Sequence, residues 1–170
     1  MKSIIICEGY TDCVLLQYFL RKVYGWKDGG RDKVLESTFK SMRVLKKASD
    51  TVRIGGCGGC SEIIPKLNFI LDMNNVSAEK DAEFDRIVII TDRDEIETEQ
   101  DFISRIKYTL AGNHVTAIEE IKNNEWSLCT YCNGRGKSLQ IQNVLQSVKW
   151  EDYGNIQIGF KKLYDLSVSM

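Results

Sequence analysis

Residues 3–7 read SIIIC and are followed by Glu8 and Gly9. A short apolar run rich in β-branched residues, ending at a charge and a glycine, predicts a buried strand that closes in a turn. Beyond this turn, apolar residues recur at helical spacing, with Thr11 as the predicted N-cap and Gly25 as the predicted stop. A strand followed at once by a helix is the repeating unit of an α/β sheet.

The same alternation continues along the chain. A second helix is predicted over 32–48, and a short strand at 51–54 runs into the loop sequence GGCGGC. Ser61 is a predicted cap of a third helix, RIVII at 86–90 is a fully apolar strand, and a helix follows over about 96–111. Apolar strands alternating with helices predict an α/β fold, with a mostly parallel central sheet and helices on both faces.

The chain of 170 residues is long enough for one domain. Residues 1–124 are predicted to form the α/β domain, with a weaker strand at 115–121. Residues 125–170 carry a weaker signal, which indicates a helix at 138–148 and a strand at 155–160. This segment is predicted to be a C-terminal elaboration of the same domain or the opening of a larger region.

Composition narrows the functional classes. The net charge of −1 provides no global basic field, so any surface for phosphate groups has to be local. The longest apolar runs are far shorter than the ~20 residues that span a bilayer. These features predict a cytoplasmic protein without a membrane partner, whose cysteines are reduced thiols or metal ligands rather than disulfides.

Acidic residues follow two of the predicted strands. Residues 3–7 end at Glu8, and residues 86–90 lead through Thr91 to Asp92 and Asp94. Ligands of parallel α/β sheets bind beyond the carboxyl ends of the strands, so neighbouring strands would bring these carboxylates together. Asp12, on the first turn of the following helix, would face the same crevice.

Such a cluster has two interpretations. Any single strand-end acid is more simply a helix cap or a solvated loop residue. Several together repel one another unless a cation neutralises them, and oxygen ligands suit Mg²⁺ or Mn²⁺. The complete set therefore favours a metal site.

Three stretches of the sequence resemble a known family. IIICEGYTD at 4–12 is similar to the strand–Glu-Gly-x-x-Asp motif of Toprim domains, and IVIITDRD at 87–94 is similar to their strand–Asp-x-Asp motif. VRIGG at 52–56 resembles their middle strand and glycine turn. The resemblance covers about residues 3–121. The glycine-loop spacing looks most like the overcoming-lysogenization-defect (OLD) nucleases or related stand-alone Toprim proteins.

The resemblance implies a Rossmann-like Toprim fold and roles for the acids. Glu8 would be a general acid/base or a metal ligand, and Asp92 and Asp94 would hold Mg²⁺. Asp12 would support a second metal or a water. Metal-bound phosphate oxygens would then be polarised for in-line displacement.

Four further residues are weaker candidates, namely Gly9, Gly55, Gly56 and Glu97. Glu97 lies where this chain departs from the family pattern. Many Toprim proteins have a glycine shortly after Asp-x-Asp, whereas this chain reads Glu-Ile-Glu at 95–97. Glu97 could be an extra ligand. The favoured interpretation is a negative charge that stabilises the N-terminus of the next helix.

Two CxxC pairs suggest a second metal. The pairs Cys57–Cys60 and Cys129–Cys132 have the spacing of structural Zn²⁺ ligands, but they would have to meet through the fold. Unligated thiols are the favoured interpretation, and Cys7 and Cys13 are predicted core residues.

Basic residues provide candidate contacts with nucleic acid. The turn Asn133–Ser138 is basic and glycine-rich. Arg43, Lys46 and Lys47 are predicted to form a solvated helix face that could steer phosphate groups.

Three functions follow as hypotheses. The leading one is Mg²⁺-dependent phosphoryl transfer, in the form of nucleic-acid cleavage. The alternative is a non-catalytic Toprim module that binds nucleic acid or a partner protein, with a homodimer as one such arrangement. The third is a zinc-stabilised interaction protein.

Overall fold

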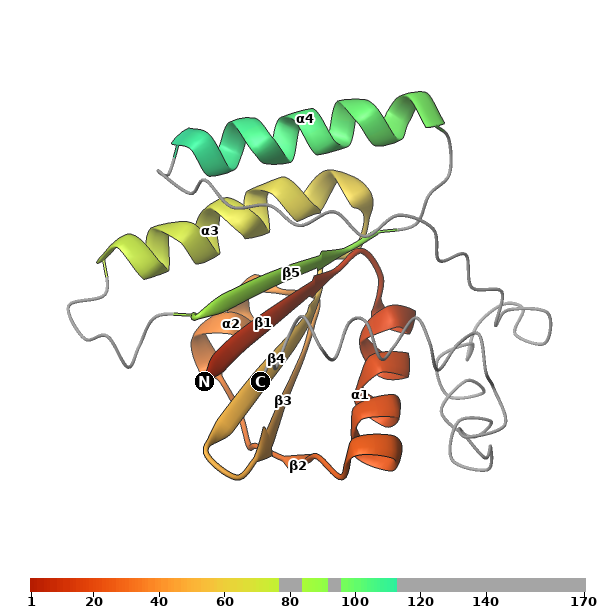
Figure 1. Cartoon of the computed structure of the whole chain (residues 1–170), viewed down its shortest axis with the longest axis vertical. Coiled ribbons are helices and arrows are strands. Elements are labelled where there is room, and N and C mark those ends of the chain that lie inside the picture. The colour runs from red at the N-terminus through yellow and green to blue at the C-terminus, as the bar shows by residue number, and fades with distance from the viewer. Residues whose placement is uncertain (77–83, 92–95, 113–170) are drawn as a thin grey trace.

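The computed structural model describes residues 1–76, 84–91 and 96–112. Strands and helices alternate along these residues (Figure 1). In chain order the elements are β1 (Lys2–Cys7), α1 (Tyr10–Tyr24), β2 (Lys27–Asp28), α2 (Lys33–Thr38), β3 (Ser41–Lys47), β4 (Asp50–Gly56), a 3-10 turn (Cys60–Glu62), α3 (Ile63–Val76), β5 (Arg86–Ile90) and α4 (Ile96–Gly112).

The described strands form one mixed sheet in the order β2-β3-β4-β1-β5. β1 lies between β4 and β5 and is parallel to both, whereas β3 is antiparallel to β4 and to β2. The α/β fold with a parallel core is therefore confirmed. The edge formed by β2 and β3 is antiparallel, because a short turn joins β3 directly to β4.

Helices cover both faces of the sheet: α1 lies on one side, and α3 and α4 lie on the other (Figure 1). Successive side chains of a strand point to opposite faces. Ile5 of β1 therefore packs with α1, whereas Ile4 and Ile6 pack with α2 and α3, and all three are almost fully buried. Burial on both faces explains why β1 is a continuous apolar run.

The predicted helix at 32–48 is wrong in its second half. The Asp32 carboxylate accepts a hydrogen bond from Leu35 N at 3.2 Å, which caps α2, and this helix ends at Thr38. The chain then forms β3, which returns antiparallel along β4 through the turn between Lys47 and Asp50. Tertiary pairing outweighs the helical spacing of the apolar residues in this segment.

Most other boundaries agree with the sequence predictions. The N-cap of α1 is Gly9 rather than the predicted Thr11, so the helix starts at Tyr10. Its C-cap is Gly25, the predicted stop. The strand predicted at 51–54 continues through Gly55 and Gly56, so the glycine loop is shorter than GGCGGC.

The helix predicted at about 96–111 is α4. The elements predicted at 115–121, 138–148 and 155–160 lie outside the described residues. Within the described part of the chain, none of the helices combines the length and the apolar character that crossing a bilayer requires.

Gly55 lies where β4 touches the aromatic ring of Phe39. A β-carbon on Gly55 would lie 2.5 Å from Cδ1 and 2.7 Å from Cε1 of that ring. Phe39 is buried, so the ring has little space into which to move. The absence of a side chain at Gly55 therefore brings α2 and β4 together.

We expect Gly55→Ala to lower the free energy of unfolding by about 1–3 kcal/mol, the usual effect of overpacking a core. Gly112→Ala is the matched control, because a β-carbon there meets nothing within 4 Å. Chemical denaturation of both variants and the wild-type protein provides the measurement. Equal midpoints for all three would contradict the contact.

Candidate metal centre at the sheet edge

The paired ends of β1 and β5 place Glu8 beside Thr91. Their parallel register pairs Cys7 with Ile90, and the Glu8 N–H donates to the Ile90 carbonyl at 3.0 Å. This bond continues the ladder one step beyond the last paired residues. The predicted convergence of the ends of these two strands is therefore present in the backbone.

A glycine loop holds the main chain of Glu8 from the side of β4. Gly58 N and Gly59 N donate to the Glu8 carbonyl at 2.9 and 3.0 Å, and Cys57 N donates to Cys7 O at 2.8 Å. Gly58 and Gly59 have φ values of 95° and 143°. Side-chain-bearing residues rarely adopt these conformations, so the loop needs glycine at both positions.

The carboxylate of Glu8 is bound by the neighbouring strand end. The Thr91 hydroxyl Oγ1 donates to Glu8 Oε2 at 2.7 Å. Cys60 Sγ lies 3.9 Å from the same hydroxyl oxygen. All three residues are partly buried, so this polar group lies at the rim of the core rather than in open solvent.

Asp12 has a structural role at the start of α1. Its Oδ2 accepts a hydrogen bond from Gly9 N at 2.9 Å, which satisfies a backbone donor at the start of the helix. A carboxylate there also interacts favourably with the helix dipole. Helix capping is the alternative to metal binding for a single strand-end acid, and the support of a second metal by Asp12 stays a prediction.

The other predicted ligands lie where side chains are not described. Asp92 directly follows Thr91, and Asp94 is two residues further on, in the segment 92–95 that is outside the described residues. Glu97 lies in the first turn of α4, and its side chain is likewise outside them. Among the residues that are described, no three His, Cys, Asp or Glu side chains are arranged to hold a metal ion.

The remaining glycine candidates have backbone roles. Gly9 is the N-cap of α1, and a β-carbon on Gly56 would lie 3.0 Å from the Gly9 carbonyl oxygen. Gly56 therefore lets β4 approach the turn that carries Glu8. The same β-carbon would also collide with Ser41 Oγ, so the close packing of β3 against β4 also requires glycine at position 56.

The site residues predicted from the sequence do not include Thr91, Gly58 or Gly59. The signal for the glycines is their position in GGCGGC, directly after the strand predicted at 51–54. The signal for Thr91 is its position directly after the predicted strand at 86–90, which matches the position of Glu8 directly after the strand at 3–7.

The predicted cysteine pairs differ in accessibility. Cys57 is fully buried, and burial raises its thiol pKa to about 12, whereas Cys60 is partly exposed. Cys129 and Cys132 lie outside the described residues, and the Zn²⁺ site stays a prediction.

The other two thiols occupy the core, as predicted. Cys7 and Cys13 are fully buried. Burial raises the pKa of Cys13 to about 11 and that of Cys7 well above its usual value.

The predicted basic face is not a helix face. Arg43 lies in β3, partly buried, and its Nε donates to Gln17 Oε1 at 2.9 Å. Lys46 and Lys47 are exposed, but they pair with the start of β4, at the opposite end of the sheet from Glu8. These lysines are therefore poorly placed to steer phosphate groups to the acidic edge. Asn133–Ser138 lies outside the described residues.

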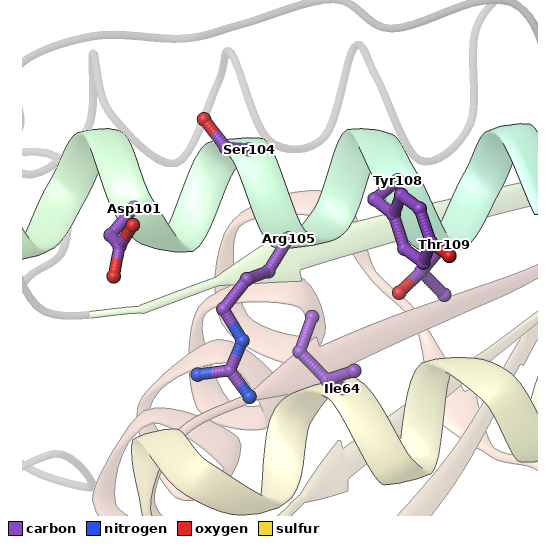
Figure 2. A pocket seen from close by; sticks show the side chains of 6 residues that line it. All are labelled: Ile64, Asp101, Ser104, Arg105, Tyr108 and Thr109. Carbon is purple, nitrogen blue, oxygen red and sulfur yellow. The ribbon is translucent and has the colours of Figure 1, made fainter.

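A groove of about 340 Å³ lies between α3 and α4 (Figure 2). Arg105 points from α4 toward Ile64 of α3, and Tyr108 and Thr109 lie one turn further along α4. None of the residues at the ends of β1 and β5 lines this groove. It is a feature separate from the candidate metal centre.

Comparisons with known proteins identify no family. No protein-family model matches the sequence, and no curated protein matches it. Among solved structures, a hypothetical protein from Pyrococcus horikoshii OT3 is similar, with 21% sequence identity and a TM-score of 0.49. The match covers 61% of this chain and 46% of that one, so the chain spans less than half the length of its structural neighbour.

The cysteine environments predict an order of thiol reactivity. At pH 8 in the folded protein, we expect a maleimide to label Cys60 well before Cys7, Cys13 or Cys57, because the thiolate is the reactive form and burial suppresses it. Labelling of all four should become comparable after denaturation.

Peptide mapping by mass spectrometry measures the labelled fraction at each position. A Cys60→Ser protein is the control, since it should leave the other three equally slow. Fast labelling of Cys57 in the folded wild-type protein would contradict its buried position.

Proposed function

We propose that this chain is a Mg²⁺-dependent phosphoryl-transfer enzyme that cleaves nucleic acid, with Mn²⁺ as a replacement ion. The observation that supports the proposal is the hydrogen-bonded pairing of the ends of β1 and β5, which places Glu8 beside Thr91, one residue before Asp92. Sequence resemblance to the nuclease-type Toprim proteins supports it independently.

The donor atoms at this edge suit the proposed ion. The Glu8 and Thr91 side chains offer oxygen atoms, and the adjoining Asp92 and Asp94 would add carboxylates. Mg²⁺ prefers oxygen ligands and keeps several waters, so it needs only a few carboxylates from the protein. A bound ion would supply Lewis-acid polarisation of a phosphate oxygen.

The residues of the chain divide the remaining work. Asp92 and Asp94 are proposed to hold the ion. Glu8 is proposed to ligate it or to exchange a proton with the reacting group, for which its fixed main chain and its bound carboxylate are suited. Asp12 is proposed to position a water or to support a second ion.

The location of the site also suits a polymeric substrate. Glu8 and Thr91 lie at the carboxyl edge of the sheet, where α/β proteins bind their ligands, and neither lines the groove between α3 and α4. A nucleic-acid phosphate can reach such an edge without the whole polymer entering a pocket. DNA and RNA share this phosphate chemistry, so both belong in the test.

We expect the purified protein to cleave DNA or RNA only when Mg²⁺ or Mn²⁺ is present. Glu8→Gln and Asp92→Asn should each reduce the rate by roughly 100-fold or more, because each removes a carboxylate from the reacting centre. Gel-based cleavage of labelled single- and double-stranded substrates measures the rates.

Asp72→Asn is the matched control, since it removes an exposed carboxylate from α3, well along the chain from the strand ends. It should cleave at the wild-type rate. Full activity in both Glu8→Gln and Asp92→Asn would show that any nuclease activity arises elsewhere.

A further inference from the structure

We infer that Thr91 is a positioning residue, whose hydroxyl holds the Glu8 carboxylate in the orientation that the proposed metal centre uses. The inference rests on the proposed function for the role of Glu8. The contact itself does not depend on that function, because it follows from the fold: Thr91 Oγ1 and Glu8 Oε2 lie 2.7 Å apart.

The backbone places the two side chains on the same face of the sheet. Glu8 and Thr91 are the next residues after the register pair of Cys7 and Ile90. Residues at equivalent positions of parallel neighbours project from the same face, here the face that Ile6 and Ile89 share with α3. The hydroxyl therefore reaches the carboxylate without distortion of either strand.

The Thr91 hydroxyl has two candidate acceptors but only one hydrogen to donate. Both Glu8 Oε2 and Cys60 Sγ lie within reach of Thr91 Oγ1, at 2.7 and 3.9 Å. A hydroxyl has one hydrogen, and a bond to an ionised carboxylate is shorter and stronger than a bond to a neutral sulfur. Thr91 therefore donates to Glu8 rather than to Cys60.

A threonine is well suited to this task. Its branched β-carbon restricts χ1, so the hydroxyl has few alternative orientations before any ligand arrives. One oxygen of Glu8 is then fixed by Thr91, while the Glu8 main chain is fixed by Ile90, Gly58 and Gly59. The side chain is restrained at both ends.

The first test compares Mn²⁺ affinity among threonine variants. Thr91→Val keeps the shape and removes the hydroxyl, and we expect it to weaken Mn²⁺ binding by about 10- to 100-fold, as loss of a group that orients a metal ligand does. Thr91→Ser restores the hydroxyl and should recover most of the affinity. Thr38→Val removes a hydroxyl of α2 that donates to the Val34 carbonyl, and this variant should bind as the wild-type protein does.

Free Mn²⁺ measured by electron paramagnetic resonance gives the affinities, and thermal unfolding confirms that each variant is folded. Equal binding by Thr91→Val and the wild-type protein would overturn the inference. Equal losses in Thr91→Val and Thr91→Ser would also overturn it, because the hydroxyl would then not be the group that matters.

A second readout needs no metal. In protein labelled with ¹³C at the glutamate carboxyl carbons, Glu8→Gln assigns the Glu8 signal. We expect Thr91→Val to shift this signal in the metal-free protein and Thr91→Ser to keep it near the wild-type position.

The two readouts distinguish the ways of failing. A wild-type protein that binds no Mn²⁺ would contradict the proposed metal centre, while the carboxyl signal would still report on the contact. A signal unchanged in Thr91→Val would overturn the positioning role whether or not Mn²⁺ binds.

Discussion

The parallel, in-register pairing of β1 with β5 is the constraint on which the candidate site depends. It joins residues more than eighty positions apart and sets Glu8 next to Thr91 through the Glu8 N–H bond to Ile90. Burial of β1 on both faces resists sliding, because a one-residue slip would exchange the side chains that face α1 and α3. The geometry of the polar edge is therefore set by the apolar core.

The central elements follow directly from the sequence. SIIIC and RIVII are apolar after their first residues, Ser3 and Arg86, and for β1 this reflects burial on both faces of the sheet. The rule that parallel strands gather ligands at their carboxyl ends then predicts that the acids following these two strands lie near one another. That prediction requires the two strands to be neighbours, which the pairing of β1 with β5 confirms, whereas the convergence of the acids themselves stays a prediction.

Other features depend on contacts that the local pattern does not encode. Met42, Val44 and Leu45 fit a helical spacing, but they form β3 because β4 is available as an antiparallel partner. Arg43 is predicted to be a solvated surface residue, but in the structure its guanidinium donates to Gln17 of α1. In the sequence, Thr91 is an ordinary strand-forming residue. Its contact with the Glu8 carboxylate is visible only in the folded structure. The positions of Asp92 and Asp94 relative to Glu8 lie beyond the described residues.

The glycine loop at Gly58 and Gly59 has a consequence for substitution at position 8. Its bonds to residue 8, like the bond from residue 8 to Ile90, join main-chain atoms. The identity of the side chain at position 8 therefore contributes nothing to these bonds, and a different residue there would stand at the same point in space. Loss of the acid at position 8 therefore does not require loss of the architecture that surrounds it.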